Sequence, residues 1–340
     1  MTAIPHEPTV VMSSGMQVRA FLLRRGFEIV FLLMIVFYSL AAPRFLTFDN
    51  INSLLHAAAP TMVIASGLAL VVMTGKLDMS VGSIAFVAAT IGTILMIRYD
   101  VPLLPALVVI LVTGALLGAL NGLIILVLRI NPLIATMGTM IALRGVGLEL
   151  TRSSVINLPD DVRRLGGLTV GPIFADVLVA LAIMLVIHIL HTRTPFGRRI
   201  MAIGNDPDTA ARLGVRVSRV TFWSFVLSGF LASIGGFLTT LQVGGVSAYL
   251  GSGLEFVGVS IVVIGGISLF GGEGSILPGV LRGALMLEII RNGLNHLGAD
   301  PYAYRFVNGG IIFVAMYADS LRSRLPAQIK RLRLGQSAKQ

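Results

Sequence analysis

The chain has no cysteine and few charges, and these two absences exclude several classes of protein. Without cysteine there are no disulfides, no thiol catalysis and no cysteine-based metal site, although the redox compartment stays undecided. Only 12% of the 340 residues are charged and 55% are hydrophobic, whereas a soluble globular domain is about one quarter charged. Such a chain would expose large apolar patches to water. We therefore expect a polytopic membrane protein whose solvent is lipid.

Motifs for catalysis and nucleotide binding are also missing. The sequence contains no HExxH, no nucleophile elbow and no convincing catalytic pair. It also lacks the phosphate-binding loop, because Gly75-Lys76 continues with Leu77 instead of Ser or Thr. The formal charge of +10 does not indicate nucleic acid, since the basic residues lie in loops and at the ends, where they orient membrane proteins. We expect no enzyme activity, no ATP binding, no cofactor and no nucleic-acid partner.

The apolar segments predict an all-α integral membrane protein with about ten transmembrane helices, several of them short or broken by glycine. A membrane-spanning helix needs about 20 apolar residues. The candidate segments are residues 26–42, 58–74, 81–97, 102–128, 132–150, 172–190, 221–241, 256–270, 276–294 and 302–319. They define a transmembrane domain at 26–320, between a largely unstructured N-terminal tail at 1–25 and a basic tail at 321–340.

Charge near the ends sets the expected orientation. Arg19, Arg24 and Arg25 precede the first apolar run, and Pro43-Arg44 follows it where a cleaved signal peptide would need small residues. We therefore expect an uncleaved anchor with a cytoplasmic N-terminus. About ten spans then place the basic loop 192–220 and the C-terminus on the same side, as the positive-inside rule requires.

The basic loop 192–220 contains a predicted short helix from Pro207 to Leu213. Asp206 suits its N-cap, Pro207 its first position, and Gly214 the left-handed conformation that ends it. Asp208 adds negative charge at the positive end of the helix dipole. A plain connection would not need caps at both ends, so we interpret the segment as a docking helix on which a soluble partner pushes. The alternative is a basic loop that only fixes topology.

A weak similarity between two segments of the chain indicates two corresponding helix breaks. Val71-Val72 precede Gly75 in the first, and Val262-Val263 precede Gly265-Gly266 in the second. Each break is followed by a Gly-Ser-Ile sequence, at 82–84 and 274–276. Broken helices in corresponding halves point to the substrate path of a transporter, because freed backbone groups are tolerated only beside water or protein. This gives a possible internal repeat of two halves, with chance similarity of glycine-rich segments as the alternative.

Several polar residues lie within or beside the predicted spans. In the first break, Asp78 can cap the next helix through N–H groups near Ser80 and Val81, or act as a substrate-hydroxyl acceptor or proton carrier. Glu288 and Arg291 have the spacing of a pair on one helix face. The candidates for the substrate path are Asp78, Ser80, Asn121, Thr136, Thr139, Glu255 and Asn292. The candidates for coupling to a partner are Gly204, Asn205, Asp206, Pro207, Asp208, Ala211 and Gly214.

From about residue 50 onward, the chain resembles the permease subunits of bacterial ABC importers for ribose, xylose, arabinose and related sugars. The segments that carry the resemblance are TGKLDMSVG at 74–82, similar to the family signature TGGIDLSVG, NPLIATMGT at 131–139 with Arg144-Gly145, the cytoplasmic segment 197–211, VIGGISL at 263–269 with Gly271-Gly272, and NGL at 292–294. Together they are specific for the family, but none of them identifies the sugar.

The chain departs from the family pattern at two places. Lys76 stands where the family usually has glycine or another small residue. FVGVS at 256–260 replaces the usual Asp-Ala-Ile-Ala-Ala. If these positions line the path, the ligand is atypical, for instance a sugar alcohol or a deoxy sugar.

The resemblance implies a multi-pass inner-membrane permease that works by alternating access, with both termini in the cytoplasm. The implied partners are a cytoplasmic ATP-binding subunit on the coupling segment, a periplasmic or lipid-anchored sugar-binding protein, and a second copy of this chain or a homologous permease. The main alternative is an ion-coupled secondary transporter with Asp78, Glu149 or Glu288 as carrier. A passive channel and a membrane enzyme are weaker alternatives.

Overall fold

The computed structural model describes residues 14–300 and part of 306–320, with side chains from residue 28 onward. The predicted C-terminal tail at 321–340 and most of the predicted span 302–319 lie outside the described residues. The long helices are α1 (Ser14–Ala41), α2 (Phe48–Val72), α3 (Val81–Arg98), α4 (Leu103–Leu128), α5 (Pro132–Thr151), α7 (Ala175–Arg193), α10 (Val217–Val243) and α12 (Leu281–His296). The shorter helices are α6 (Asp160–Arg163), η1 (Arg164–Gly167), α8 (Pro195–Asn205), α9 (Pro207–Arg212), α11 (Leu254–Ile264) and the π-helix η2 (Ile276–Val280).

The prediction of an all-α membrane protein is confirmed. Six of the described helices are long and apolar enough to cross a membrane, and two shorter apolar helices are Glu28–Ala41 within α1 and α11. The described strands form only two antiparallel pairs of two residues each. β1 (Ile156–Asn157) pairs with β4 (Gly245–Val246), and β2 (Thr169–Val170) pairs with β3 (Ile173–Phe174). The total of ten spans stays a prediction.

The core is organised around α2. Most of its residues from Ala58 to Val72 are buried, and it packs against α7, α10, α11 and α12. In contrast, α4 is apolar around its whole circumference, yet few of its residues are buried within the chain. Leu104, Leu116 and Val127 are each more than 60% exposed. A helix that is apolar on all sides needs an apolar environment, so this outer surface suits lipid.

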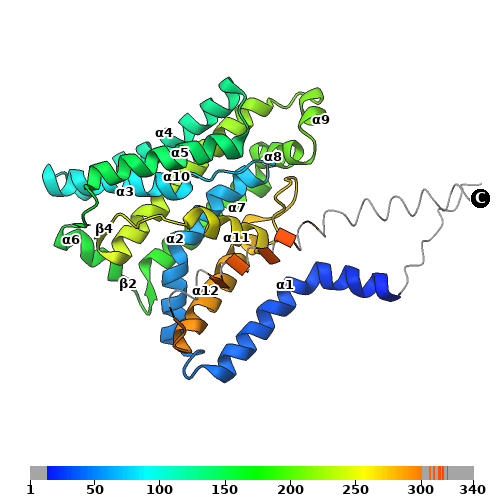
Figure 1. The fold of residues 1–340 in the computed structure, drawn as a ribbon, viewed down its shortest axis with the longest axis horizontal. Coiled ribbons are helices and arrows are strands. Elements are labelled where there is room, and N and C mark those ends of the chain that lie inside the picture. Colours follow the sequence, from blue (N-terminus) through cyan, green and yellow to red (C-terminus); the bar gives the residue numbers. More distant parts are fainter. Residues whose placement is uncertain are drawn as a thin grey trace, which may run out of the picture.

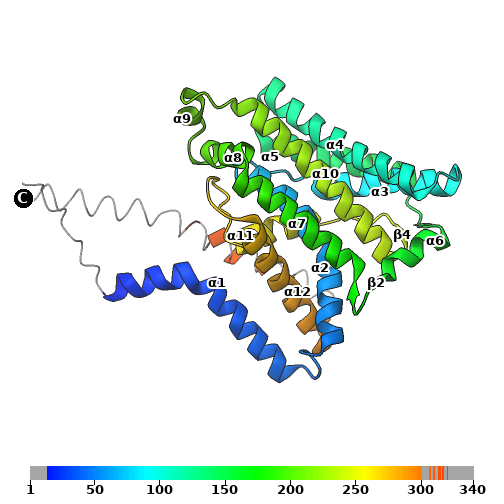
Figure 2. The ribbon, with the colours of Figure 1, turned by 180° about the vertical axis from the view of Figure 1, so that it is seen from behind.

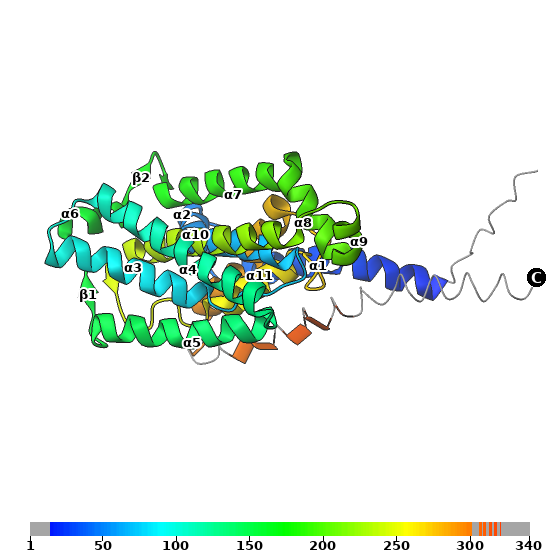
Figure 3. The same ribbon diagram turned by 90° about the horizontal axis from the view of Figure 1, so that it is seen from above.

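The molecule has two distinct ends. The helices α8 and α9 lie at one end, on the same side of the view as the start of α1 but well separated from it (Figure 1). The helix α6 and the short strands lie at the opposite end, and the views from behind and from above show the same separation (Figure 2, Figure 3). The long helices α4, α5 and α10 run between the two ends, whereas α3 extends only toward the end with α6. The two ends of the molecule are therefore joined mainly by long helices.

Several predicted boundaries are wrong. α1 begins at Ser14 rather than at residue 26, because no proline or glycine interrupts residues 16–25, so part of the expected unstructured tail is helical. α2 begins at Phe48 rather than at residue 58, since Thr47 caps it by accepting a hydrogen bond from the Asn50 N–H. α11 ends at Ile264 rather than at residue 270, where the glycine-rich segment begins. The helix α8 is not predicted at all.

Candidate functional site

The first helix break, residues 73–80, joins α2 to α3. The N–H groups of Thr74 and Gly75 donate to the carbonyls of Val71 and Val72, at 2.9 and 2.8 Å, which closes the end of α2. Gly75 has φ of +74°, a left-handed conformation that favours glycine. The chain then extends through Lys76 and Leu77 before it reaches the buried Asp78.

Asp78 is the centre of a buried hydrogen-bond network. Its Oδ1 accepts from the backbone N–H and the hydroxyl of Ser80, at 3.0 and 2.6 Å. Its Oδ2 accepts from the hydroxyl of Ser228 on α10 at 3.0 Å. The Ser80 hydroxyl in turn accepts from Nδ2 of Asn121 on α4 at 2.6 Å, and the Met79 N–H donates to the Thr136 hydroxyl on α5 at 3.1 Å. The first break is therefore tied to three other helices.

This geometry brings together four predicted site residues, namely Asp78, Ser80, Asn121 and Thr136. The Ser80 N–H donates to Asp78 as expected, but Ser80 rather than Asp78 is the N-cap of α3, and no side chain caps that helix. A buried polar network is favourable when its members are satisfied. Asp78 has three donors for its two oxygens, whereas Oδ1 of Asn121 has no hydrogen-bond partner among the described residues. The arrangement favours a fixed structural carboxylate. Ser228 is the member that sequence analysis missed, because one serine in an apolar helix carries no distinguishing pattern.

The second helix break, residues 265–275, separates α11 from η2 and α12. Gly266 has φ of +84°, and its N–H donates to the Val263 carbonyl at 2.9 Å. This repeats the geometry of Gly75 and Val72 at the corresponding positions of the first break. Further along, Gly271, Gly272 and Gly274 also have positive φ. The two breaks thus share their first turn, while the two-half repeat of the whole chain stays a prediction.

The two breaks touch each other, and α8 packs against their contact. The Gly272 N–H donates to the Met73 carbonyl at 3.0 Å. Gly204, near the end of α8, lies so close that an added Cβ would be 2.0 Å from the Met73 oxygen and 2.1 Å from the Gly272 nitrogen. Only glycine fits such a backbone approach. The predicted coupling residue Gly204 therefore contacts both breaks at once.

The helix α9 forms within one residue of its predicted range. Oδ1 of Asp206 accepts from the N–H groups of Asp208 and Thr209, at 3.0 and 3.1 Å, and Oδ2 accepts from the Thr209 hydroxyl at 2.7 Å. These hydrogen bonds lower the pKa of the exposed Asp206 carboxyl, and the bond from the Thr209 hydroxyl has the largest effect. Gly214, with φ of +83°, follows the end of the helix.

The surface of α8 and α9 is exposed and polar, apart from a few anchoring residues. On α8, Ile200 and Ile203 are buried, while the two neighbouring arginines point outward. On α9, only Ala210 is buried, and Leu213 just beyond it is 79% exposed. The remaining predicted coupling residues, all exposed, are Asn205, Asp206, Pro207, Asp208, Ala211 and Gly214. α8 and α9 together thus present a large surface that is held to the chain along one side.

A cavity of about 680 Å³ borders the second break and α8. Met201 of α8 and the segment Gly272–Ser275 line it, and α1 and α12 complete its wall. Glu28 of α1 and Arg282 of α12 form an ion pair at its edge, with an N–O distance of 3.3 Å. The second break consequently has open space on one side.

Glu255 and Thr139 lie outside the Asp78 network. Glu255 is buried at the start of α11, and an added Cβ on Gly82 would be 2.6 Å from its Oε2. Arg144 of α5 is its nearest electrostatic partner, and this guanidinium also donates to the Leu250 carbonyl at 2.7 Å. The Thr139 hydroxyl donates a hydrogen bond to the Thr136 carbonyl of its own helix.

Asn292 is separated from the other path candidates. It exchanges amide hydrogen bonds of 2.9 and 3.0 Å with Asn50 near the start of α2, whereas the Asp78 network follows the end of α2. The predicted pair of Glu288 and Arg291 on the same helix is present, at 3.9 Å. The path assignments of all seven residues stay predictions, and only four of them share one cluster.

Known sequences match the chain over most of its length. The model of a family described as "Branched-chain amino acid transport system / permease component" matches residues 50–316. A probable ABC transporter permease protein, YphD of Escherichia coli strain K12, is 34% identical over 90% of this chain and 92% of its own length.

Two further relatives from the same strain are named for sugars. The ribose import permease protein RbsC is 32% identical over 89% of this chain and 95% of its own length. The D-allose transport system permease protein AlsC is 31% identical over 88% of this chain and 91% of its own length. No solved structure matches the chain.

Proposed function

The chain belongs to the family of branched-chain amino acid transport system permease components, a family of transport proteins rather than enzymes, and from this membership we propose that it is the membrane subunit of an ATP-driven, binding-protein-dependent sugar importer. The relatives named for ribose and D-allose support a monosaccharide or a closely related polyol as the substrate class.

The contact between Gly204 and both helix breaks carries this proposal. A partner that pushes on the exposed surface of α8 and α9 moves Gly204, and Gly204 has no free space toward Met73 or Gly272. The displacement is therefore passed to both breaks. In transporters, broken helices line the substrate path, and switching access requires rigid-body movement around them. The partner on this surface is a cytoplasmic subunit that hydrolyses ATP.

The orientation in this proposal places α8, α9 and the start of α1 in the cytoplasm. The basic residues in the 192–220 loop and at the C-terminus support it, because positive charge is retained on the cytoplasmic side. The opposite end, with α6 and the short strands, then faces a sugar-binding protein that delivers the substrate. High affinity in that protein removes the need for a tight site within the membrane.

A second copy of this chain, or a homologous permease, completes the proposed importer by packing along α5. Gly138 and Gly145 lie seven residues apart on α5, and an added Cβ on either would meet nothing within 4 Å. Ile134 and Ile141, also seven apart, are 66% and 67% exposed. Small residues along one face of a helix allow another membrane helix to approach closely.

The ion-coupled alternative would need a carboxylate that binds and releases an ion. Asp78 is fully buried and accepts three hydrogen bonds, which disfavours that role. Such a transporter would also continue uptake after ATP depletion, whereas the proposed importer would stop.

Replacement of residues 206–213 by a flexible Gly-Ser linker tests the proposal. The expected result is a folded permease that assembles in the membrane but no longer couples ATP hydrolysis to uptake of radiolabelled ribose or D-allose. A matched control replaces residues 153–155, a connection at the other end of the molecule, by the same kind of linker. ATP-dependent uptake at the unmodified rate in the 206–213 variant would contradict the docking role of α9.

A further inference from the structure

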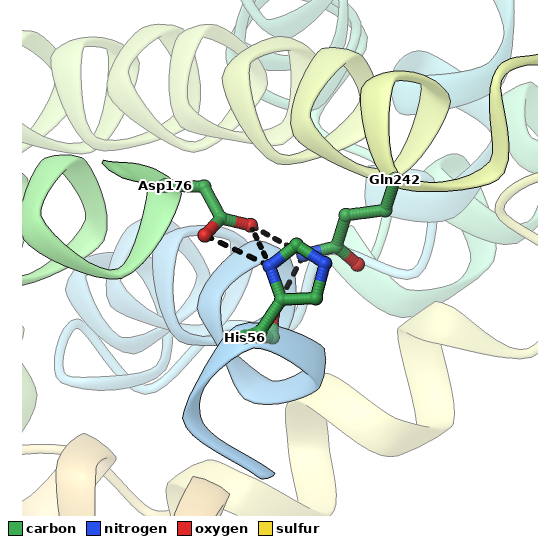
Figure 4. Close-up of polar contacts among 3 residues, drawn as sticks. All are labelled: His56, Asp176 and Gln242. Atoms are coloured by element: carbon green, nitrogen blue, oxygen red, sulfur yellow. Dashed lines mark hydrogen bonds and ion pairs between the residues drawn. The ribbon is translucent and has the colours of Figure 1, made fainter. Parts of the chain in front are cut away.

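A cluster of three polar side chains joins α2, α7 and α10 at the end of the molecule opposite α8 and α9. Figure 4 shows His56, Asp176 and Gln242 pointing toward one another from these three helices. The Nδ1 atom of His56 lies 2.9 Å from Oδ1 and 2.8 Å from Oδ2 of Asp176. The Nε2 of Gln242 donates to Asp176 Oδ2 and to the His56 carbonyl, both at 2.6 Å.

This cluster is largely shielded but still reachable by water. The side chains of His56 and Asp176 are 21% and 12% exposed. The ring of Phe174, from the short strand before α7, stacks on the His56 ring with centroids 4.1 Å apart. A small cavity of about 330 Å³ lies alongside, and Arg163 at its wall is already paired with Asp160. The contacts of Asp176 thus hold the first turn of α7 against α2 and α10.

The helix α7 connects this cluster directly to α8. Its 19 residues span about 28 Å, from Asp176 in the first turn to Arg193. The corner between α7 and α8 is closed tightly, because an added Cβ on Gly197 would be only 1.7 Å from the His191 carbonyl oxygen. A tilt of α7 about its first turn therefore moves α8 along with it.

We propose that His56, Asp176 and Gln242 form an outer latch that sets the tilt of α7 and, through it, the position of α8 and α9 against the two helix breaks. The latch residues are positioning residues, since they act through α7 and contact neither break. In the structure described here the hydrogen bonds of the latch are formed. When they break, α7 is free to tilt, which allows the permease to open toward the other side of the membrane. The role in an access cycle rests on the proposed transport function, whereas the effect on α8 does not.

The absence of cysteine allows a direct test with spin labels. Arg199→Cys on α8 and Val127→Cys on α4 are exposed positions at the same end of the molecule, and pulsed EPR measures the distance between labels attached to them. The labelled chain is purified without partner subunits and placed in lipid nanodiscs. A tilt of about 10° at one end of a 28 Å helix displaces the other end by about 5 Å, so the shift is measurable.

Three variants of the latch separate its hydrogen bonds from its packing. His56→Phe keeps an aromatic ring for Phe174 but loses the contact with Asp176. His56→Asn restores a donor near the position of Nδ1. Asp176→Asn keeps the shape of the carboxylate and removes its charge, which provides a second disruption if His56→Phe fails to fold.

The expected result is a shift on the order of 5 Å, or a second distance, in His56→Phe and Asp176→Asn. In His56→Asn the single distance of the unmodified latch should return. Unchanged distances in both disrupting variants would overturn the proposal. Equal shifts in His56→Asn and His56→Phe would also overturn it, because a restored donor to Asp176 would then have no effect on the position of α8. None of these measurements involves ATP or uptake, so they decide on the latch independently of the linker experiment that decides on the transport function.

Discussion

The two helix breaks begin with the same turn but are held in place by different forces. In the first, Asp78 and Ser80 are fully buried, and side chains from α4, α5 and α10 bond to the break. In the second, glycines with positive φ and backbone hydrogen bonds predominate, and a large cavity lies on one side. The first break is therefore held by side chains from three helices, whereas the second is held by its own backbone and borders open space.

This difference gives α8 a specific mechanical position. Its Gly204 touches Met73 of the first break and Gly272 of the second. A displacement of α8 consequently acts on both breaks at the point where they touch. Packed elements with two discrete arrangements can turn small shifts into larger transitions. The comparison thus predicts a large loss of stability when the first break is altered, and loss of coupling when the α8 contact is altered.

The largest effect is expected from Asp78→Leu. It removes the acceptor for three hydrogen bonds and leaves the buried hydroxyls of Ser80 and Ser228 without that partner. We expect a loss of about 3 kcal/mol or more in the free energy of unfolding, since each unsatisfied buried donor costs about 1–3 kcal/mol. Thermal unfolding of the purified protein in detergent measures it. Asp78→Asn, which keeps an acceptor oxygen, should be much milder, and equal losses in the two variants would contradict the network as the support of this break.

Gly204→Ala should have a smaller effect on stability but a decisive one on coupling. The new Cβ would overlap backbone atoms of both breaks, which cannot rotate away as a side chain can. Overpacking of this kind costs about 1–3 kcal/mol, and relief requires α8 to move outward. ATP-dependent uptake in proteoliposomes should then be lost while the protein stays folded. Gly167→Ala, where an added Cβ meets nothing within 4 Å, is the matched control and should keep uptake.

Gly75→Ala and Gly266→Ala test whether the first turns of the two breaks are equivalent. Both glycines have left-handed φ angles, +74° and +84°, which cost other residues about 1–2 kcal/mol. We expect similar decreases in the thermal midpoint from the two substitutions. A large decrease for one and none for the other would show that the shared turn does not have the same energetic role in both breaks.

The smallest effect is expected from Asp206→Ala at the cap of α9. Hydrogen exchange at the Asp208 and Thr209 amides should accelerate, while the global unfolding midpoint stays unchanged, because α9 is exposed. Asp206→Asn should keep slow exchange.

The cap also predicts a pH dependence. The folded helix lowers the pKa of Asp206. The stabilisation that this cap gives to α9 is therefore complete above the ordinary carboxyl pKa and is lost as the pH falls through the lowered pKa. Protection factors at the Asp208 and Thr209 amides, corrected for the pH dependence of intrinsic exchange, that stay unchanged in acid would contradict this assignment.

Local patterns in the sequence were sufficient for several features of the candidate site. The caps Asp206 and Gly214 predicted α9 because capping depends on residues within one or two turns. The spacing of Val and Gly predicted two corresponding breaks for the same reason. The helix α8 was missed because Arg198 and Arg199 offset the hydropathy of its apolar residues, and the buried positions Ile200 and Ile203, which share one face, were not considered as a helical pattern. Hydropathy alone does not distinguish such a segment from a loop.

Contacts between distant residues could not be predicted in this way. His56, Asp176 and Gln242 are separated by 120 and 66 positions, and nothing local to any of them indicates the others. Ser228 and Asn121 likewise join Asp78 from other helices. The separation of Asn292 from that cluster, at the other end of α2, was equally invisible in the sequence.

By itself, the sequence determined that this is a membrane protein. It also determined the positions of the helix breaks and of a capped helix between two spans. These properties follow from composition and from interactions within a few residues. Only the tertiary structure decided that the two breaks touch, that Gly204 fits between them, and that one break is bonded to three other helices while the other borders open space. Those facts depend on which helices pack together, and close packing of distant backbones leaves no local signature beyond the glycine that permits it.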